Sequence, residues 1–550
     1  MTKVKKLLKL AYLLLILVLP CSAQYSKVAS GGKIMISAHP LAAKAGLEVH
    51  RKGGNVVDVA VAVAYALGVV EPHGSGIGGE GMMLIYNADE KKSVVIDFKA
   101  IAPAKATYQN LDFAKKSEWS RTVRAGSVPG AVAGLELARE RFGKLDRKGV
   151  LQPAIDYALK GFEVDSTLSL NLESYRKLLE KDAYTKSIYY PKGMAPKVGM
   201  VITNPEYGRS LQIIQAEGPD AFYKGRIADL IVRDAERRGG FITREDLLAY
   251  EPIVREPVRG SYRGYDIITT PPPCGGMLLI EALNILKHFD LNACRSDDDY
   301  SLHLYAEVFK LVFKDERTHN GDPAFSPIPV RTITSDQFAF QRLLHIDLSK
   351  SRHPQQVDAG RIVERNTTHL SVMDLEGNAV SLTITLSSLF GTSQTVEGAG
   401  FILNNEMQNF EPEGHPSNSL QPHKRVVTSL VPTILVKAGR PIYVLGTPGG
   451  DLIISTIAQV IVNLVDFGMS LPQAVDAPRM FSIGTQRELE IENRFSAKAY
   501  RLLESLGHDV KQYDAYRAYF GAVQAIMYDA RTRTLVGCSD PRRSGAAVGE

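Results

Sequence analysis

Two adjacent threonines, Thr367 and Thr368, begin a strand-like segment in which His369 and Ser371 follow at close spacing. A threonine hydroxyl is a weak nucleophile until a base accepts its proton, and the α-amine of a chain start, with a pKa of about 8, is such a base. A threonine that begins a chain therefore carries nucleophile and base on one residue. Because neighbouring strand residues face opposite sides, only one of the pair can face a given site. Taken singly, each is more simply a β-branched residue that strands favour.

The segments on either side of the sequence LEGN predict the element that would position these hydroxyls. Both alternate apolar and polar residues, as two antiparallel strands of a hairpin do. The loop Leu375–Glu376–Gly377, with its glycine in the left-handed conformation, would join them. Thr367 would then face Thr385 across about 5 Å. The same register pairs Ser371 with Ser381.

The chain has 45% hydrophobic and 23% charged residues, which is ordinary for a globular protein. No Pro- or Ser-rich linker, charge block or repeat divides it, so we predict one composite globule. Helical patterns fill much of residues 131–240, and strand patterns dominate residues 367–444. Helices packed on antiparallel sheets predict the α+β class.

Local signals near the N-terminus predict two further pairs of elements. Residues 40–70 predict two helices that are broken at Gly53–Gly54, with Asn55 as the N-cap of the second helix. Residues 81–86 and 92–98 predict a hairpin around the turn NADE.

Residues 1–23 have a lysine-bearing start, an apolar stretch over Leu10–Leu19 and the small residue Ala23 at the end. This pattern predicts a cleaved export signal and a periplasmic or extracellular location. The alternative is a lipoprotein signal with lipid on Cys21, although Pro20 stands where a small residue is wanted. No later apolar run is long enough to span a bilayer, so we expect no membrane span after signal removal.

The net charge argues against a nucleic-acid partner. It is +5 for the whole chain, and it falls to about +1 without the four lysines of the leader. Cys274, Cys294 and Cys538 remain after signal removal and can form at most one disulfide. The hydrophobic core must therefore stabilise the protein.

Nine segments fall in the order seen in gamma-glutamyltransferases, and the chain resembles this family over nearly all of its mature part. They are EPHGSGIGGEGMMLIY, DFKAIAPAKAT, GSVPGAVAGLELARERFG, GPDAFYKGRIADLIV, GGFITREDLLAYEPIVREPVRGSYRGY, TTHLSVMDLEGNAVSLTITL, LNNEMQNF, LGTPGG and SDPRRSG. The resemblance implies an N-terminal-nucleophile hydrolase built as a four-layer αββα sandwich. Family members cut themselves before a threonine, which implies a large subunit, 24–366, and a small catalytic subunit, 367–550, that stay assembled.

The same resemblance implies the catalytic residues. Thr367 matches the nucleophile, which makes Asn366–Thr367 the bond that the precursor cuts. Thr385 resembles the threonine that orients the nucleophile. Gly449 and Gly450 match the turn whose backbone N–H groups stabilise the oxyanion, and their lack of side chains permits a close approach to the reacting carbon.

The substrate-binding positions are partly retained. Thr428 and Ser429 match the hydroxyl pair that binds the α-carboxylate of the donor, and Glu406 is kept in the segment LNNEMQNF. His369 belongs to the family pattern, and we interpret it as structural.

Three other substrate-binding positions depart from the family. Lys99 stands in place of an arginine and keeps the charge without the two-pronged geometry. Ser387 stands in place of an asparagine. Asn409 stands in place of the acid that holds the α-ammonium, and an amide oxygen brings no countercharge. Residues 411–423 are also shorter than the lid-bearing stretch of other members. An uncovered site leaves room for a bulky donor or a polymer and admits water, although neutral variation in loop length explains the same difference.

We therefore predict an exported, self-processing amidohydrolase or acyltransferase that cleaves gamma-glutamyl or glutaryl-like amides through a threonine acyl-enzyme. One alternative is a true gamma-glutamyltransferase acting as a glutathione hydrolase. An alternative of another class is a processed binding protein without turnover. The sequence shows no metal-ligand motif and no cofactor fingerprint, so neither is expected.

Overall fold

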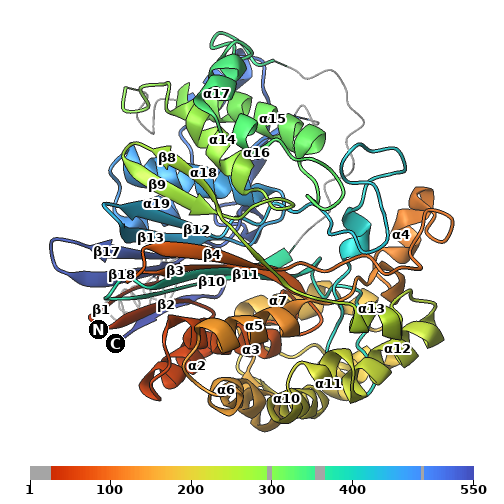
Figure 1. The fold of residues 1–550 in the computed structure, drawn as a ribbon. Helices are drawn as coiled ribbons and strands as arrows, with labels where there is room; N and C mark the ends of the chain where they lie inside the picture. Colours follow the sequence, from red (N-terminus) through yellow and green to blue (C-terminus); the bar gives the residue numbers. More distant parts are fainter. Residues whose placement is uncertain (1–26, 294–299, 353–365, 485–487) are drawn as a thin grey trace, which may run out of the picture.

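Two seven-stranded antiparallel sheets lie face to face at the centre of the molecule, and helices cover the outer face of each sheet (Figure 1). The structure is a computed structural model that describes residues 27–293, 300–352, 366–484 and 488–550. The layers follow the order helix, sheet, sheet, helix, and this αββα sandwich confirms the predicted fold class.

The first sheet contains the predicted threonine hairpin. Its strands, in spatial order, are β19 (Ala546–Gly549), β2 (Ile34–Ala38), β10 (Asn366–Asp374), β11 (Ala379–Ser387), β3 (Glu80–Asn87), β4 (Lys92–Phe98) and β7 (Ile253–Arg255). The strands of the second sheet are β1 (Lys27–Gly31), β18 (Thr534–Ser539), β17 (Gln524–Asp529), β13 (Arg440–Gly446), β12 (Thr433–Lys437), β9 (Tyr265–Thr269) and β8 (Val258–Tyr262). Two small sheets contain β14 (Met480–Phe481), β15 (Glu488–Glu492) and β16 (Asp509–Tyr513), and β5 (Phe162–Glu163) and β6 (Val201–Ile202).

Helices from the first half of the chain lie on the outer side of the first sheet, and those of residues 40–51, 56–70 and 131–142 make most of the contacts with its strands. The helices on this side are α2 (Pro40–Arg51), α3 (Val56–Val70), α5 (Ala131–Phe142), α6 (Arg147–Lys160), α7 (Ser166–Ser174), α8 (Arg176–Leu179), α9 (Ala183–Tyr189), α10 (Pro205–Glu217), α11 (Asp220–Tyr223), α12 (Arg226–Arg238) and α13 (Arg244–Leu248), with the short α4 (Lys116–Trp119) at one end. The second sheet is covered by α14 (Gly276–Leu286), α15 (Tyr300–His319), α16 (Val330–Ile333), α17 (Asp336–Leu343), α18 (Leu452–Val465) and α19 (Leu471–Asp476), while α20 (Ala497–Ser505) packs beside β16 and α15.

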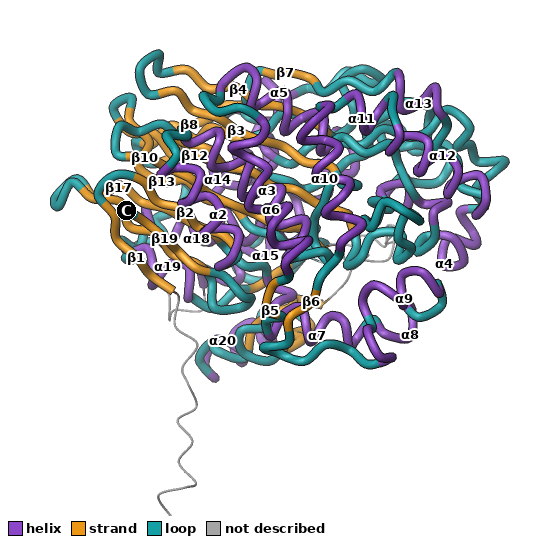
Figure 2. The backbone as a smooth tube through the Cα atoms, turned by 90° about the horizontal axis from the view of Figure 1, so that it is seen from below, coloured by secondary structure: helices purple, strands orange, loops and turns teal. Residues whose placement is uncertain are grey.

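The helix pair α2 and α3 forms as predicted. The Asn55 side chain caps α3 by accepting hydrogen bonds from the amides of Val57 and Asp58, and the Asp58 carboxylate accepts a hydrogen bond from the Asn55 amide. Every residue of α3 is buried, because the helix lies between the first sheet and α6. Figure 2 looks onto this helical layer and shows α3 and α6 side by side. The apolar α3 thus becomes the support behind β10 and β11.

The hairpin of β10 and β11 has the predicted loop and the predicted register over most of its length. Ser371 pairs with Ser381, and Gly377 has a φ of +100°, in the left-handed region. The register shifts by one residue at the open end, because Asn366 pairs with Ser387. Thr367 therefore lies at an irregularity in the ladder, where the regular register we predicted does not hold.

The prediction of at most one disulfide can be compared with the structure at two of the three cysteines, Cys274 and Cys538. Cys274 and Cys538 are buried and form no disulfide within the described part of the chain, whereas Cys294, Cys21 and the whole leader lie outside the described residues. Among the described helices, none combines the length and the apolar character that crossing a membrane requires. The hydrophobic core on both sides of the sheets is the stabilising element that the sequence predicts.

Candidate active site

A pocket opens where the ends of β10 and β11 meet the loops that follow η4 (Glu406–Asn409) and β13. Most of the site residues predicted from the sequence line it. The lining residues are Thr367, Thr385, Ser387, Glu406, Asn409, Thr428, Ser429, Leu430, Gly450 and Ile453. Of the remaining predicted residues, Gly449 adjoins Gly450, the side chain of Asn366 is not described, and Lys99 is absent from the lining. Leu430 and Ile453 were missed, because apolar residues carry no chemical signal in a sequence.

Thr367 and Thr385 are neighbours at the end of the hairpin. The Thr367 hydroxyl donates to Thr385 Oγ1 over 3.4 Å, a long contact, and the same oxygen accepts a hydrogen bond of 2.8 Å from the Ser387 amide. The carbonyl of Thr367 accepts a bond of 3.3 Å from Arg543. Both threonine side chains are buried, so their hydroxyls are held in a fixed environment.

Thr368 points to the opposite face of β10, as strand alternation requires. Its hydroxyl donates to Glu71 Oε2 over 3.0 Å, just beyond the end of α3. Burial raises the pKa of the Glu71 carboxyl. Thr368 is therefore engaged on the helical side of the sheet, away from the pocket.

His369 lies between the two sheets. Its Nδ1 is 2.8 Å from Thr383 Oγ1, and its Nε2 is 3.2 Å from Ser371 Oγ. Burial lowers the pKa of the ring to about 3, so the imidazole is neutral at physiological pH. A side chain at Gly446 of the second sheet would collide with this ring. The ring therefore fills the space between the sheets and bonds to strand hydroxyls.

The turn Gly449–Gly450 leads directly into α18. The two φ angles, +143° and +58°, both lie in the region that favours glycine. The carbonyls of these glycines accept the amides of Leu452 and Ile453, at 3.2 Å each, which places the turn at the N-terminal end of the helix. The partial positive charge of a helix N-terminus favours an anion there. The turn therefore lies at a helix end whose field favours an anion.

Thr428 and Ser429 of the pocket lining each contact a polar side chain from a distant part of the sequence, Cys274 and Glu316 respectively. Thr428 Oγ1 lies 3.4 Å from the buried thiol of Cys274, whose pKa is raised to about 12 by burial. Ser429 Oγ donates to Glu316 of α15 over 3.3 Å. Neither Cys274 nor Glu316 was singled out from the sequence, because each is distant along the chain from the hydroxyl it meets.

Asn409 is held by two pocket residues through its amide nitrogen. Nδ2 donates to Glu406 Oε2 over 2.7 Å and to Ser387 Oγ over 2.8 Å. The Glu406 carboxylate can only accept, so the amide nitrogen must face it. The amide oxygen of Asn409 is buried and finds no partner among the described residues. The pocket therefore presents an unused hydrogen-bond acceptor.

Lys99 is neutralised by a residue that the sequence analysis missed. Its ammonium pairs with Glu80 of β3, and both side chains are fully buried. Burial opposes the charge of Lys99, but the carboxylates of Glu406 and Glu80 outweigh it and raise the pKa of the ammonium. The sequence signal for this pair was Glu80, an acidic residue at the start of the otherwise apolar strand segment EGMMLIY.

The buried pair gives a test of what Lys99 does. Lys99→Met leaves Glu80 and Glu406 together without their cation, and removing one partner of a buried pair costs about 3–5 kcal/mol. We expect a clear fall in the midpoint of thermal unfolding, measured by calorimetry, whereas Lys92→Met at an exposed lysine should leave the midpoint nearly unchanged. A stable Lys99→Met protein that only binds its donor more weakly would contradict this structural role.

A second buried charge network lies in the segment SDPRRSG, residues 539–545. Asp540 accepts from Arg479 over 2.5 Å and from Arg542 over 3.2 Å, and Arg542 also bonds both oxygens of Glu492, at 2.8 and 2.5 Å. The next residue is Arg543, which contacts the Thr367 carbonyl. The network therefore fixes the backbone from which Arg543 reaches β10.

Residues 411–423 contribute nothing to the described pocket lining. Tyr108 binds this short segment at two points. Its hydroxyl donates a hydrogen bond to the Glu411 carbonyl over 2.7 Å and accepts one from the Leu420 amide over 2.6 Å. Within the described residues, no tyrosine of this segment covers the pocket, since the sequence of the segment contains none.

The arrangement of this pocket in a four-layer sandwich can be compared with known proteins. The family model described as Gamma-glutamyltranspeptidase matches residues 42–550. The chain belongs to the gamma-glutamyltranspeptidase family. It is 36% identical over 530 residues to the "Glutathione hydrolase proenzyme" of Escherichia coli (strain K12), covering 92% of this chain and 90% of that protein. It is 37% identical over 535 residues to the "Acylase ACY 1 proenzyme" of Pseudomonas sp. (strain SE83), covering 95% and 94%.

A solved structure of the family has the same fold. The crystal structure of cephalosporin acylase from Bacillus halodurans superposes with a TM-score of 0.86 and 29% identity, covering 95% of this chain and 97% of that one. The two sheets and their outer helices are therefore those of a gamma-glutamyltranspeptidase-family enzyme. This finding shows that the chain is an enzyme of the hydrolase and transferase kind found in this family.

Proposed function

We propose that this enzyme cuts its own chain between Asn366 and Thr367 and then hydrolyses gamma-glutamyl or glutaryl-like amides through an acyl-enzyme on Thr367. The observation that carries the proposal is the pocket that brings Thr367, Thr385 and the glycine turn of α18 together. The processing proposal agrees with the word proenzyme in the names of both relatives. Export through residues 1–23 remains a prediction.

The cut begins when the Thr367 hydroxyl oxygen attacks the Asn366 carbonyl carbon. The peptide C–N bond breaks, an ester forms, and the hydroxyl proton passes to the departing nitrogen, which becomes the α-amine of Thr367. Water then opens the ester and leaves a carboxylate on Asn366 and a free hydroxyl on Thr367.

In turnover, the freed hydroxyl attacks the amide carbonyl of the donor while the α-amine of Thr367 accepts its proton. The N–H groups of Gly449 and Gly450 would stabilise the oxyanion, and a donor of this kind is typically worth about 3–4 kcal/mol. The leaving amine takes the proton, and an ester joins the acyl group to Thr367. Water or an acceptor amine then releases the acyl group.

The neutral side chain of Asn409 favours a donor without an α-ammonium, such as a glutaryl amide, because it offers no countercharge to an ammonium. A second candidate is the hydrolysis of glutathione, which one relative is named for. The unused amide oxygen of Asn409 favours this candidate, because it can accept a hydrogen bond from a substrate ammonium. A processed protein without turnover fits less well, because the pocket holds the threonine pair and the glycine turn together.

Thr385→Ala is expected to slow both cutting and turnover by roughly tenfold, because it removes the hydrogen bond that orients Thr367. Thr385→Ser keeps the hydroxyl and should stay close to the unaltered enzyme. The rates can be followed by gel electrophoresis of the precursor and by release of aniline from an acyl anilide. Equal rates for all three proteins would contradict a positioning role for Thr385.

A further inference from the structure

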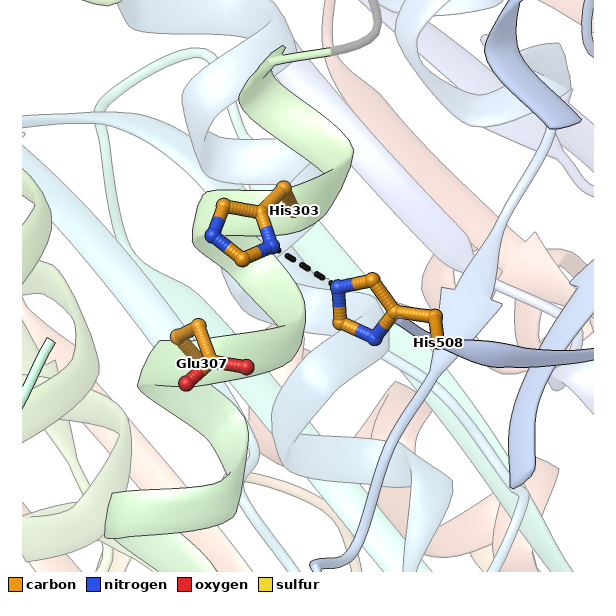
Figure 3. A group of neighbouring side chains, drawn as sticks. All are labelled: His303, Glu307 and His508. Atoms are coloured by element: carbon orange, nitrogen blue, oxygen red, sulfur yellow. Dashed lines mark hydrogen bonds between the residues drawn. The ribbon is translucent and has the colours of Figure 1, made fainter. Parts of the chain in front are cut away.

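A buried cluster of metal-ligating side chains lies outside the active site, between α15 and the chain before β16. His303 and Glu307 are one turn apart on α15, and His508 reaches them from the residue before β16 (Figure 3). One ligand atom from each of the three residues lies within 4.8 Å of the others, and all three side chains are buried. The cluster has no part in the chemistry proposed for Thr367.

The orientation of His303 is fixed from behind. Its Nε2 lies 2.8 Å from the backbone carbonyl of Asp347, and a carbonyl only accepts, so this nitrogen carries the proton. Nδ1 therefore presents a lone pair to the cluster, where it lies 2.7 Å from His508 Nε2. A second ring nitrogen bonded to a backbone carbonyl is the usual support of a metal-ligating histidine.

The Glu307 carboxylate is also held in place. Oε1 accepts from the Lys310 ammonium over 2.7 Å, while Oε2 is 3.3 Å from the Arg352 amide, a longer bond. Each carboxylate oxygen has two acceptor positions, so these contacts leave capacity for a further ligand. Lys310 in turn bonds to Ser351 Oγ, and the Ser351 amide bonds to the Leu506 carbonyl over 2.6 Å.

We propose that His303, Glu307 and His508 form a binding site for a zinc-class divalent transition metal. Two imidazoles and one carboxylate suit zinc, whereas magnesium and calcium prefer oxygen ligands alone. Bonds of about 2.0–2.1 Å in a tetrahedral arrangement place two ligand nitrogens about 3.3 Å apart. The two rings therefore need to separate by about 0.6 Å from their present hydrogen bond, and ligand atoms that are up to 4.8 Å apart need to approach by up to about 1.5 Å.

Such an ion would tie together parts of the chain that are distant in sequence. His303 and His508 are 205 positions apart, and residues 351–352 pack against the same cluster. The self-cleavage proposed above would leave His508 on the small fragment and would leave His303 and Glu307 on the large fragment. The site itself does not depend on that cleavage, and its test needs no substrate.

The test uses untagged full-length protein that has been treated with a chelator and then freed of it. We expect Zn²⁺ to bind at about one ion per chain in calorimetric titration and to raise the midpoint of thermal unfolding. We expect Co²⁺ to give the visible absorption of a low-symmetry nitrogen and oxygen site. His508→Ala and, separately, His303→Gln should lose both the stoichiometric binding and the metal-dependent rise.

His319→Ala is the matched control, because this histidine is also on α15 but lies 3.9 Å from Asp315 and outside the cluster. It should bind metal as the unaltered protein does. Absence of stoichiometric binding to the unaltered protein would overturn the proposal. Undiminished binding in either cluster variant would do the same, since it would place the ion elsewhere.

Discussion

A Thr367→Ala protein is expected to remain a single uncut chain and to lose roughly a thousandfold or more in kcat/KM towards any amide donor. The variant lacks the only atom that this account uses as nucleophile in both the cut and the turnover. Alanine removes that oxygen without adding bulk beside Thr385, so the hairpin should still form. Gel electrophoresis and an anilide assay on purified protein check the two parts of this prediction.

Thr367→Ser is the matched control, because serine keeps the hydroxyl and should still cut and turn over. Thr368→Ala tests the neighbouring threonine, whose hydroxyl bonds to Glu71 on the other face of the strand. It should cut, even if the loss of that bond slows the reaction. A Thr367→Ala chain that still separates into two fragments would refute the nucleophile assignment.

Asn409→Asp should shift donor preference towards gamma-glutamyl over glutaryl anilides by roughly ten- to a hundredfold in the ratio of kcat/KM values. In the present pocket the amide nitrogen of Asn409 bonds to Glu406 over 2.7 Å. Aspartate there would place two carboxylates together, and the α-ammonium of a gamma-glutamyl donor would relieve their repulsion. A glutaryl donor has no ammonium and gains nothing.

Gln408→Glu provides the control for charge alone. Gln408 is the adjacent residue and is not part of the pocket lining, although its amide nitrogen donates to Ser388 over 2.6 Å and to the pocket residue Ser387 over 3.3 Å. An acid at this position should leave donor preference nearly unchanged. If the unaltered enzyme already prefers gamma-glutamyl donors strongly and Asn409→Asp changes nothing, glutathione hydrolysis becomes the better account of the site.

Short-range features of this chain were predictable because their causes are local. The loop at Gly377 and the Asn55 cap each depend on a few neighbouring residues, and the structure has both. The register shift at Thr367 was not predictable in the same way, because it depends on how Asn366 pairs with Ser387. Ser387 has a φ of +78°, a conformation that a strand pattern does not predict.

Pairings between distant residues account for the other differences. Lys99 stays a predicted contact of the donor, and the pairing of β3 with β4 also brings Glu80 to its ammonium, which the sequence did not indicate. Whether a buried cation is already paired depends on the tertiary structure, and the residue type does not reveal it. The contact between His303 and His508 was hidden for the same reason, since nothing in the spacing of single histidines indicates a shared site.

Mass spectrometry tests most directly whether Thr367 carries the acyl group. The small fragment is analysed after brief incubation with a slow glutaryl or gamma-glutamyl donor and an acid quench. The expected small fragment begins at Thr367, and its fragmentation pattern localises the mass of one acyl group to Thr367. A fragment that begins at another residue, or an acyl group on any other side chain, would contradict the account.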